Sequence, residues 1–141
     1  MLQKLLKDLN ELNLPLGEFV IFGSAPLAIR NLRPCRDLDI LVSPVGWQQL
    51  IRLYPQYLRQ NLVCLKKGKI EIFYNWPGFS HKEVSAIIKE AEMFMGFPFA
   101  RLYYVWQWKK RSNRLKDKKD VELIEKFFGN KNNRPPISQL G

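Results

Sequence analysis

The chain has 141 residues, of which 46% are hydrophobic and 26% charged, and it carries a formal net charge of +10. This length fits one domain, and this composition excludes a chain that is disordered throughout or collagen-like. No stretch approaches the ~18 uncharged apolar residues of a membrane span, and the first 13 residues place charges among their leucines, unlike a secretory signal, so we expect a cytoplasmic protein that does not act at a membrane.

The first third of the chain predicts alternating helices and strands. Leucines recur at steps of three and four residues near the N-terminus, which is typical of an amphipathic helix. A wholly apolar run then predicts a buried strand, and a Gly-Ser pair joins it to a second helix with Ser24 as the N-cap. The expected elements are a helix over 2–12, a turn over 13–17, a strand over 19–22, a helix over 25–31 and a strand over 37–42.

The rest of the chain predicts two more strands and several helices. Lys66-Lys67-Gly68 joins the two strands as a hairpin, because a glycine there allows a positive φ. The expected elements are a helix over 46–58 interrupted by Pro55, strands over 61–65 and 69–74, a helix over 82–90, an irregular apolar break over 94–99, and helices over 100–111 and 118–128. We therefore predict an α+β (α/β) fold, a small mixed β-sheet flanked by helices, in one domain over 1–128 with a flexible tail over 129–141.

Two aspartates form the most informative pair in the sequence. Asp37 and Asp39 lie two residues apart on an expected strand, so their side chains point to the same face. Two like charges so close together are costly unless a cation lies between them. Hard carboxylate oxygens suit Mg²⁺ or Mn²⁺. The pair therefore predicts a divalent-metal clamp, and the alternative is a solvated strand end or a turn cap.

A third acid and a Gly-Ser turn extend this prediction. Glu71 is an isolated acid between two isoleucines on another expected strand, and it faces the same site if that strand lies beside the first. Gly23 and Ser24 stand between a strand and a helix, where backbone N–H groups are free to hold a phosphate. Alone, such a turn is common and structural. The order and spacing of the turn and the acids together favour a functional site.

Other chemistries are disfavoured by composition. Cys35 and Cys64 are the only cysteines and His81 is the only histidine, which is too few for a zinc site or a disulfide framework. A Ser–His–acid triad would depend on His81 alone, in a Pro-Gly segment that resembles a loop. Residues 101–141 hold 11 Lys or Arg against 4 acids, which favours polyanionic partners, although a solvated basic helix face is the simpler explanation.

These residues resemble the nucleotidyltransferase superfamily of the DNA polymerase β type. The segment Phe-Val-Ile-Phe-Gly-Ser at 19–24, followed by Asp-Leu-Asp-Ile-Leu-Val at 37–42, looks like the core motif of that family. Near the C-terminus, Trp-Lys at 108–109 and Arg-Leu-Lys-Asp-Lys-Lys-Asp at 114–120 look like the ending of small bacterial members, which include antibiotic-modifying and toxin–antitoxin-type enzymes. The likeness spans about residues 18–128. Glu71 departs from the more usual aspartate.

The resemblance implies transfer of a nucleoside monophosphate from a nucleoside triphosphate to an unidentified acceptor, with release of pyrophosphate. Asp37, Asp39 and Glu71 would hold two metal ions, or Glu71 would act as general base. Gly23 and Ser24 would hold the β- and γ-phosphates, and Arg33 or Arg36 would neutralise phosphate charge. The remaining candidate nucleotide-binding residues are Lys109, Arg114 and Lys116.

The C-terminal helices leave further roles open. Asp117 and Asp120 are expected to cap and charge-complement the last helix. Trp106 is expected in the core, whereas Trp108 and Tyr104 are better candidates for stacking a base. The acceptor (a small molecule, a protein or an RNA) would be held by these helices, by a second subunit of an oligomer, or by nothing. The alternatives to an enzyme are a basic nucleic-acid-binding module and a non-catalytic partner protein of the toxin–antitoxin type.

Overall fold

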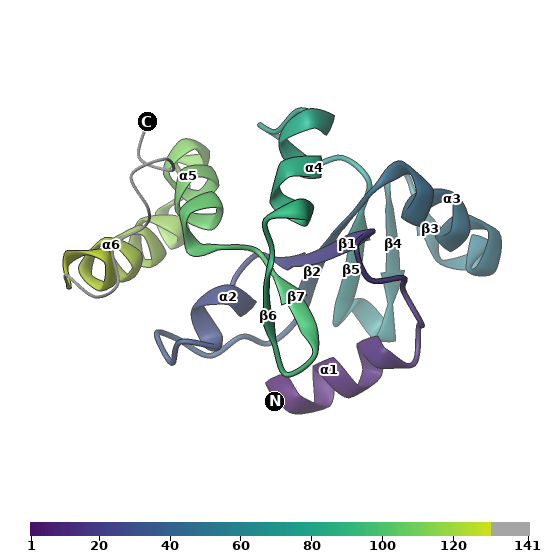
Figure 1. Ribbon diagram of the computed structural model, residues 1–141, viewed down its shortest axis with the longest axis horizontal. Helices are drawn as coiled ribbons and strands as arrows, with labels where there is room; N and C mark the ends of the chain where they lie inside the picture. Colours follow the sequence, from purple (N-terminus) through teal and green to yellow (C-terminus); the bar gives the residue numbers. More distant parts are fainter. Residues whose placement is uncertain (131–141) are drawn as a thin grey trace.

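A seven-stranded mixed sheet forms the centre of the computed structural model, which describes residues 1–130 (Figure 1). Helices flank this sheet, and two of them, α5 and α6, follow the last strand, so the predicted α+β class is confirmed. In chain order the elements are α1 (Leu2–Asn10), β1 (Phe19–Phe22), α2 (Ala25–Ala28), β2 (Leu38–Val42), α3 (Pro44–Leu53), the 3₁₀ turn η1 (Pro55–Tyr57), β3 (Leu58–Arg59), β4 (Leu62–Leu65), the 3₁₀ turn η2 (Lys66–Gly68), β5 (Ile70–Phe73), α4 (His81–Lys89), β6 (Glu92–Phe94), β7 (Phe97–Phe99), α5 (Leu102–Ser112) and α6 (Leu115–Gly129).

The strands follow the order β3-β4-β5-β2-β1-β7-β6 across the sheet. The central strand β2 is antiparallel to β1 and parallel to β5. The pair β1 and β7 is also parallel, while β3–β4, β4–β5 and β6–β7 are antiparallel hairpins. Both parallel pairs join strands that are far apart in sequence, so they bring distant residues to the middle of the sheet.

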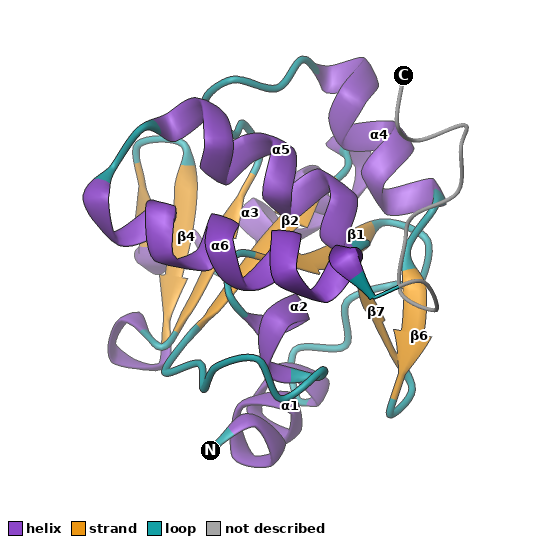
Figure 2. Ribbon diagram, turned by 90° about the vertical axis from the view of Figure 1, so that its left-hand side faces the viewer, coloured by secondary structure: helices purple, strands orange, loops and turns teal. Residues whose placement is uncertain are grey.

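Both faces of the central sheet are buried, and alternate side chains along a strand belong to different apolar clusters. On β1, Phe19 and Ile21 belong to one apolar cluster, and Val20 and Phe22 belong to a second. The first cluster includes the leucines of α1 and Leu50 of α3, and the second is covered by α4, α5 and α6. Figure 2 shows α5 and α6 side by side in front of the strands. Polar groups that point toward the second cluster therefore lie beneath these C-terminal helices.

Several local predictions agree with the structure. The hairpin at residues 66–68 is present, and Lys66, Lys67 and Gly68 all adopt positive φ, which makes the turn unusually dependent on left-handed backbone. The predicted interruption at Pro55 is also present, because α3 ends at Leu53 and a 3₁₀ turn begins at the proline. The second helix is shorter than expected, since Asn31 at φ +59° ends the helical turns that continue past Ala28.

The irregular break predicted over 94–99 is wrong. This region forms the β6–β7 hairpin, whose two-residue turn places Met95 at φ +53° and Gly96 at φ +81°. Both residues of such a turn need positive φ, and methionine seldom adopts it. The unusual turn residue therefore conceals the hairpin at the level of sequence. The strand β7 then gains its place by parallel pairing with β1, which no local pattern reports.

The C-terminal helices begin and end a few residues from the predicted positions. A left-handed Asn113 at φ +58° separates α5 from α6 and reverses the chain. Gly129, expected in the tail, is the last residue of α6, and the rest of the predicted tail over 131–141 lies outside the described residues. Within residues 1–130, every helix is too short or too polar to cross a membrane.

Candidate functional site

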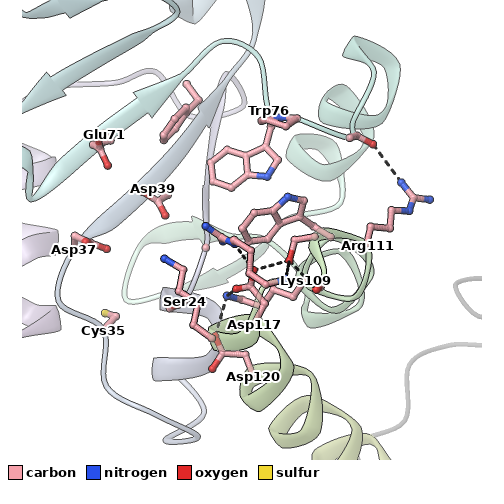
Figure 3. A pocket seen from close by; sticks show the side chains of 18 of the residues that line it. Ser24, Cys35, Asp37, Asp39, Glu71, Trp76, Lys109, Arg111, Asp117 and Asp120 are labelled. Carbon is pink, nitrogen blue, oxygen red and sulfur yellow. Dashed lines mark hydrogen bonds and ion pairs between the residues drawn. The ribbon is translucent and has the colours of Figure 1, made fainter.

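A cavity of about 790 Å³ lies between the sheet and the helices α5 and α6 (Figure 3). Its walls come from the turn after β1, the loop before β2, the strand β5, the loop that follows it, and both helices. This volume falls within the ~300–1,000 Å³ of typical ligand sites. All ten candidate site residues line it, namely Gly23, Ser24, Arg33, Arg36, Asp37, Asp39, Glu71, Lys109, Arg114 and Lys116.

Two of the acids come together through the parallel pairing of β2 and β5. In this register Asp39 lies directly opposite Glu71. Neighbouring strands are ~4.8 Å apart, so the backbones at these two residues are about that far apart, and both side chains point to the same face of the sheet. Asp37 lies one residue before β2 and also lines the cavity. The neighbouring apolar residues point to the opposite face, as the alternation predicts.

The three acids repel one another electrostatically. The pKa of Asp39 is raised to about 7, first by burial and then by the negative charges of Asp37 and Glu71. The cations Lys109 and Lys116 oppose this shift. A nearby cation would stabilise the ionised form of a carboxylate that is buried and surrounded by other negative charges.

The donor set at these strands suits a hard divalent cation. Carboxylate oxygens are the ligands that Mg²⁺ prefers, and one inter-strand spacing is compatible with two carboxylates that share one ion. However, no three Asp, Glu, His or Cys side chains within the described chain are already gathered closely enough to hold a metal ion. The residues therefore fit the ion in chemistry and placement, and their side chains would have to turn toward it.

The Gly-Ser turn lies against the acids. Gly23 has φ +68°, and a Cβ built there would come within 2.7 Å of Asp39 Oδ2. Only glycine fits this position, because any side chain would both strain the backbone and displace the aspartate. Ser24 is the N-cap residue of α2, as predicted, although its side chain makes no cap hydrogen bond. Its hydroxyl is left available to the cavity.

Lys109 is held by a buried acidic pair. Its Nζ lies 3.2 Å from Asp117 Oδ1 and 2.8 Å from Asp120 Oδ2, and all three side chains are at most 4% exposed. A buried lysine needs such partners, because an unpaired charge in the protein interior is very costly. Lys109 is therefore anchored at the cavity wall with a fixed orientation (Figure 3).

The prediction that Asp117 and Asp120 cap the last helix is wrong, although Asp117 does lie in the first turn of α6, where its charge complements the helix. No side chain caps the start of α6. Instead Ser112 Oγ and Arg114 Nε donate hydrogen bonds to Asp117 at 2.5 and 2.6 Å, and Arg33 donates to both oxygens of Asp120 at 2.9 and 3.0 Å. The pKa of Asp117 is lowered, because these hydrogen bonds and the Lys109 charge outweigh the opposing effect of burial.

The cations of the cavity fall into two groups. Arg33, Lys109 and Arg114 form ion pairs with the two aspartates of α6, and Arg111 forms one with Glu83. Arg36 and Lys116 are exposed and form no hydrogen bond or ion pair with residues 1–130. Their charges are thus available to an anion that enters the cavity.

Aromatic residues line the remaining wall, and sequence reasoning identified only one of them. Trp108 lies there as predicted, together with Phe73 and Trp76, which the sequence analysis missed. Phe73 could have been found, because it follows Glu71 at strand spacing. Tyr104 lies outside the cavity, where its hydroxyl donates a hydrogen bond to Glu90 and burial raises its pKa to about 12.

The cavity is therefore lined by three carboxylates, a close-fitting Gly-Ser turn, a fixed lysine and two cations that form no ion pair within residues 1–130. Such a set can bind an anionic ligand together with a divalent cation.

Trp106, expected in the core, is half-buried and packs against the cluster beneath the C-terminal helices. In comparisons with known proteins, neither a family model nor a curated protein matches this chain.

Proposed function

We propose that the protein is a metal-dependent nucleotidyltransferase on a nucleotidyltransferase-type sheet, which moves a nucleoside monophosphate from a nucleoside triphosphate to an acceptor. The observation that carries this proposal is the register that sets Asp39 opposite Glu71, beside the turn at Gly23 and beneath Lys109. An anion site alone would need only the cations. The added carboxylates make sense when the ligand arrives with a divalent cation.

The chain's own residues would bind and orient the triphosphate. Gly23 allows the backbone to approach a phosphate closely, and the unused hydroxyl of Ser24 can donate to a phosphate oxygen. Lys109, fixed by Asp117 and Asp120, would offer a charge that costs little to position. Arg36 and Lys116 would neutralise the rest of the phosphate charge.

The reaction would be an in-line displacement at the α-phosphorus. A bond forms between the acceptor oxygen and this phosphorus, the bond to the bridging oxygen breaks, and pyrophosphate leaves with its electron pair. Glu71 would either help to hold a second metal ion or accept the proton that the acceptor hydroxyl loses. Asp37, Asp39 and Glu71 would hold Mg²⁺ or Mn²⁺, which when bound would offset negative charge on the reacting oxygens.

The test is transfer of label from each of the four α-labelled nucleoside triphosphates to a component of a cell extract, with Mg²⁺ present. We expect Asp39→Asn to reduce labelling about a hundredfold or more, because the metal contributes several kcal/mol to such reactions. The matched control is Asp8→Asn, a half-buried aspartate on α1 that does not line the cavity. Equal labelling by the wild type and Asp39→Asn would reject the proposal.

The same variant separates an enzyme from a basic binding module. A module that only holds nucleic acid would bind it with an affinity that falls steeply with salt and ignores Asp39. An enzyme would bind a non-hydrolysable triphosphate with Mg²⁺ in calorimetry and lose that binding in Asp39→Asn. Co-purification of a second protein without any labelling would favour the non-catalytic partner.

A further inference from the structure

Arg33 belongs to the loop that carries the acids, yet its guanidinium group binds to α6. It lies four residues before Asp37, between α2 and β2. Its Nη1 donates hydrogen bonds to both carboxylate oxygens of Asp120, at 3.0 and 2.9 Å. Its Nε donates another to the carbonyl oxygen of Pro34, at 3.1 Å. The guanidinium is thus oriented by its own loop and bound to one carboxylate of the last helix.

Asp120 connects Arg33 to Lys109. Its Oδ2 lies 2.9 Å from Arg33 Nη1 and 2.8 Å from Lys109 Nζ, so the two cations share one oxygen. The side chain of Asp120 is 4% exposed, whereas that of Arg33 is 39% exposed. A buried carboxylate between two cations has little freedom to move, because a displacement would break a charge-assisted hydrogen bond. Arg33 therefore helps to determine where the ammonium group of Lys109 lies.

Among residues 1–130, the Arg33–Asp120 bridge is the only side-chain hydrogen bond or ion pair that joins α6 to the opposite side of the cavity. The other such bonds of α6 go to Lys109, Ser112 and Arg114, which belong to α5 and the turn after it. The first half of α6, which carries both aspartates, is thus tied to the loop of the acids by Arg33. The side chains of α6 that join the apolar cluster lie in its second half, namely Leu123, Ile124, Phe127 and Phe128.

Arg36 lies three residues further along the same loop and differs from Arg33 in its partners. It is exposed, lines the cavity, and forms no hydrogen bond or ion pair with residues 1–130. A phosphate could therefore bind Arg36 without displacing a partner. To bind Arg33, a phosphate would have to compete with a buried carboxylate, and it would leave Asp120 with Lys109 alone. The two arginines thus suit different tasks.

We infer that Arg33 is a positioning residue, which acts through Asp120 to hold the Lys109 ammonium group at the cavity and does not itself contact the triphosphate. Its effect on triphosphate binding rests on the proposed function, whereas its effect on Lys109 does not. Of the two arginines that the sequence offers as phosphate ligands, only Arg36 would keep that role.

The first test follows the ammonium group of Lys109 without any ligand. Lys109 is the only lysine among residues 1–130 that is not exposed. Ammonium protons in a buried ion pair exchange slowly with water, so Lys109 should give a side-chain signal in proton–nitrogen NMR, identified by its loss in Lys109→Gln. We expect Arg33→Gln to abolish this signal and Arg36→Gln, the matched control on the same loop, to leave it unchanged. A signal that persists in folded Arg33→Gln would overturn the inference.

Calorimetry with a non-hydrolysable triphosphate and Mg²⁺ provides the second test. We expect Arg33→Gln to weaken binding about tenfold when Lys109 is present and less than about twofold in a Lys109→Gln background, because Arg33 acts through that lysine. Arg36→Gln should weaken binding by the same factor in both backgrounds. Equal factors for Arg33→Gln would mean that Arg33 touches the phosphate directly, which contradicts the inference.

Two further outcomes are distinguishable. If Lys109→Gln does not fold, because it leaves two buried aspartates with one cation fewer, the same comparison is made in Asp120→Asn, where Arg33 has lost its connection to the lysine. If the wild type binds no triphosphate, the proposed function fails, and the NMR signal of Lys109 alone decides the role of Arg33.

Discussion

Gly23 is the residue on which the placement of the acids depends most directly. Its φ is +68°, and a Cβ at this position would lie 2.7 Å from Asp39 Oδ2, which leaves no room for a side chain. Gly17 has a similar positive φ of +89°, but nothing lies within 4 Å of the point where its Cβ would stand. A substitution at either glycine would therefore strain the backbone. Only a substitution at Gly23 would also bring a side chain against Asp39.

Replacement of each glycine by alanine separates these two effects. We expect both variants to lose about 1–2 kcal/mol of unfolding free energy, the cost of a left-handed L-residue. Only Gly23→Ala should reduce nucleotide transfer, by about a hundredfold, because it displaces Asp39. Urea unfolding and the labelling assay measure the two quantities. Equal activity of the two variants would show that the close contact at Gly23 is unimportant.

Asp117 should give the protein a recognisable pH dependence of stability. Its pKa is lowered on folding, so its ionised form stabilises the folded state above the unfolded pKa of about 3.9, and this contribution is lost as the pH falls through the folded pKa. We expect Asp117→Asn to cost about 3 kcal/mol at pH 7, since one partner of buried Lys109 is removed. Urea unfolding should show the gap to the wild type closing below pH 4. A gap that does not change with pH would contradict this account.

At the scale of elements, two serines at helix starts behave differently. Ser80 caps α4 in a reciprocal capping box with Glu83, whereas Ser24 makes no cap hydrogen bond to α2. Ser80→Ala should therefore lose about 1 kcal/mol of unfolding free energy and leave triphosphate binding unchanged. Ser24→Ala should change stability by less than about 0.5 kcal/mol and weaken triphosphate binding about tenfold. Thermal unfolding and calorimetry would reveal the reverse pattern if Ser24 were structural.

The elements that sequence predicts well are those whose signals are local. The hairpin at Gly68 and the break at Pro55 follow from single residues with narrow backbone preferences. The β6–β7 hairpin escaped prediction because Met95 occupies a conformation that is rare for methionine. The alternation of side chains predicts that Asp39 and Glu71 can point to the same face of the sheet. That they lie opposite each other depends on the parallel pairing of β2 with β5, which only the folded sheet establishes.

The lysine network shows the same limit within the site. The sequence contains Lys109, Asp117 and Asp120, and a local interpretation assigns the aspartates to the start of their own helix. The left-handed Asn113 reverses the chain, so that the aspartates of α6 face Lys109 of α5 instead. The tertiary contact outweighs the local preference, because a buried lysine requires anionic partners.

At the scale of the whole molecule, one of the two edges of the sheet, at strand β6, exposes apolar side chains. The strand β6 is the last in the strand order, and Met93 and Met95 beside its turn are 57% and 52% exposed. Edge strands with exposed apolar residues promote association of chains unless charges protect them. This edge lies outside the cavity, so it can be changed without affecting the acids.

Met93→Lys should therefore raise the protein concentration at which light scattering begins to increase, because a lysine on an edge strand opposes pairing with another strand. The matched control is Leu53→Lys, since Leu53 is 55% exposed but lies at the end of a helix. Nucleotide transfer should be the same in both variants. An equal gain from the helix variant would mean that charge alone, and not the edge, controls association.

The parallel pairings of the central sheet also determine when the cavity can first exist during synthesis. Its lining residues extend from Gly23 to Asp120, and the acids meet only after β5 has joined β2. Contacts between distant segments form late, because a long stretch of chain must be ordered first. A ribosome-bound chain can thus form the antiparallel β1–β2 pair early, but the cavity is complete only when α6 has emerged. Nucleotide binding would accordingly report the final step of folding on the ribosome.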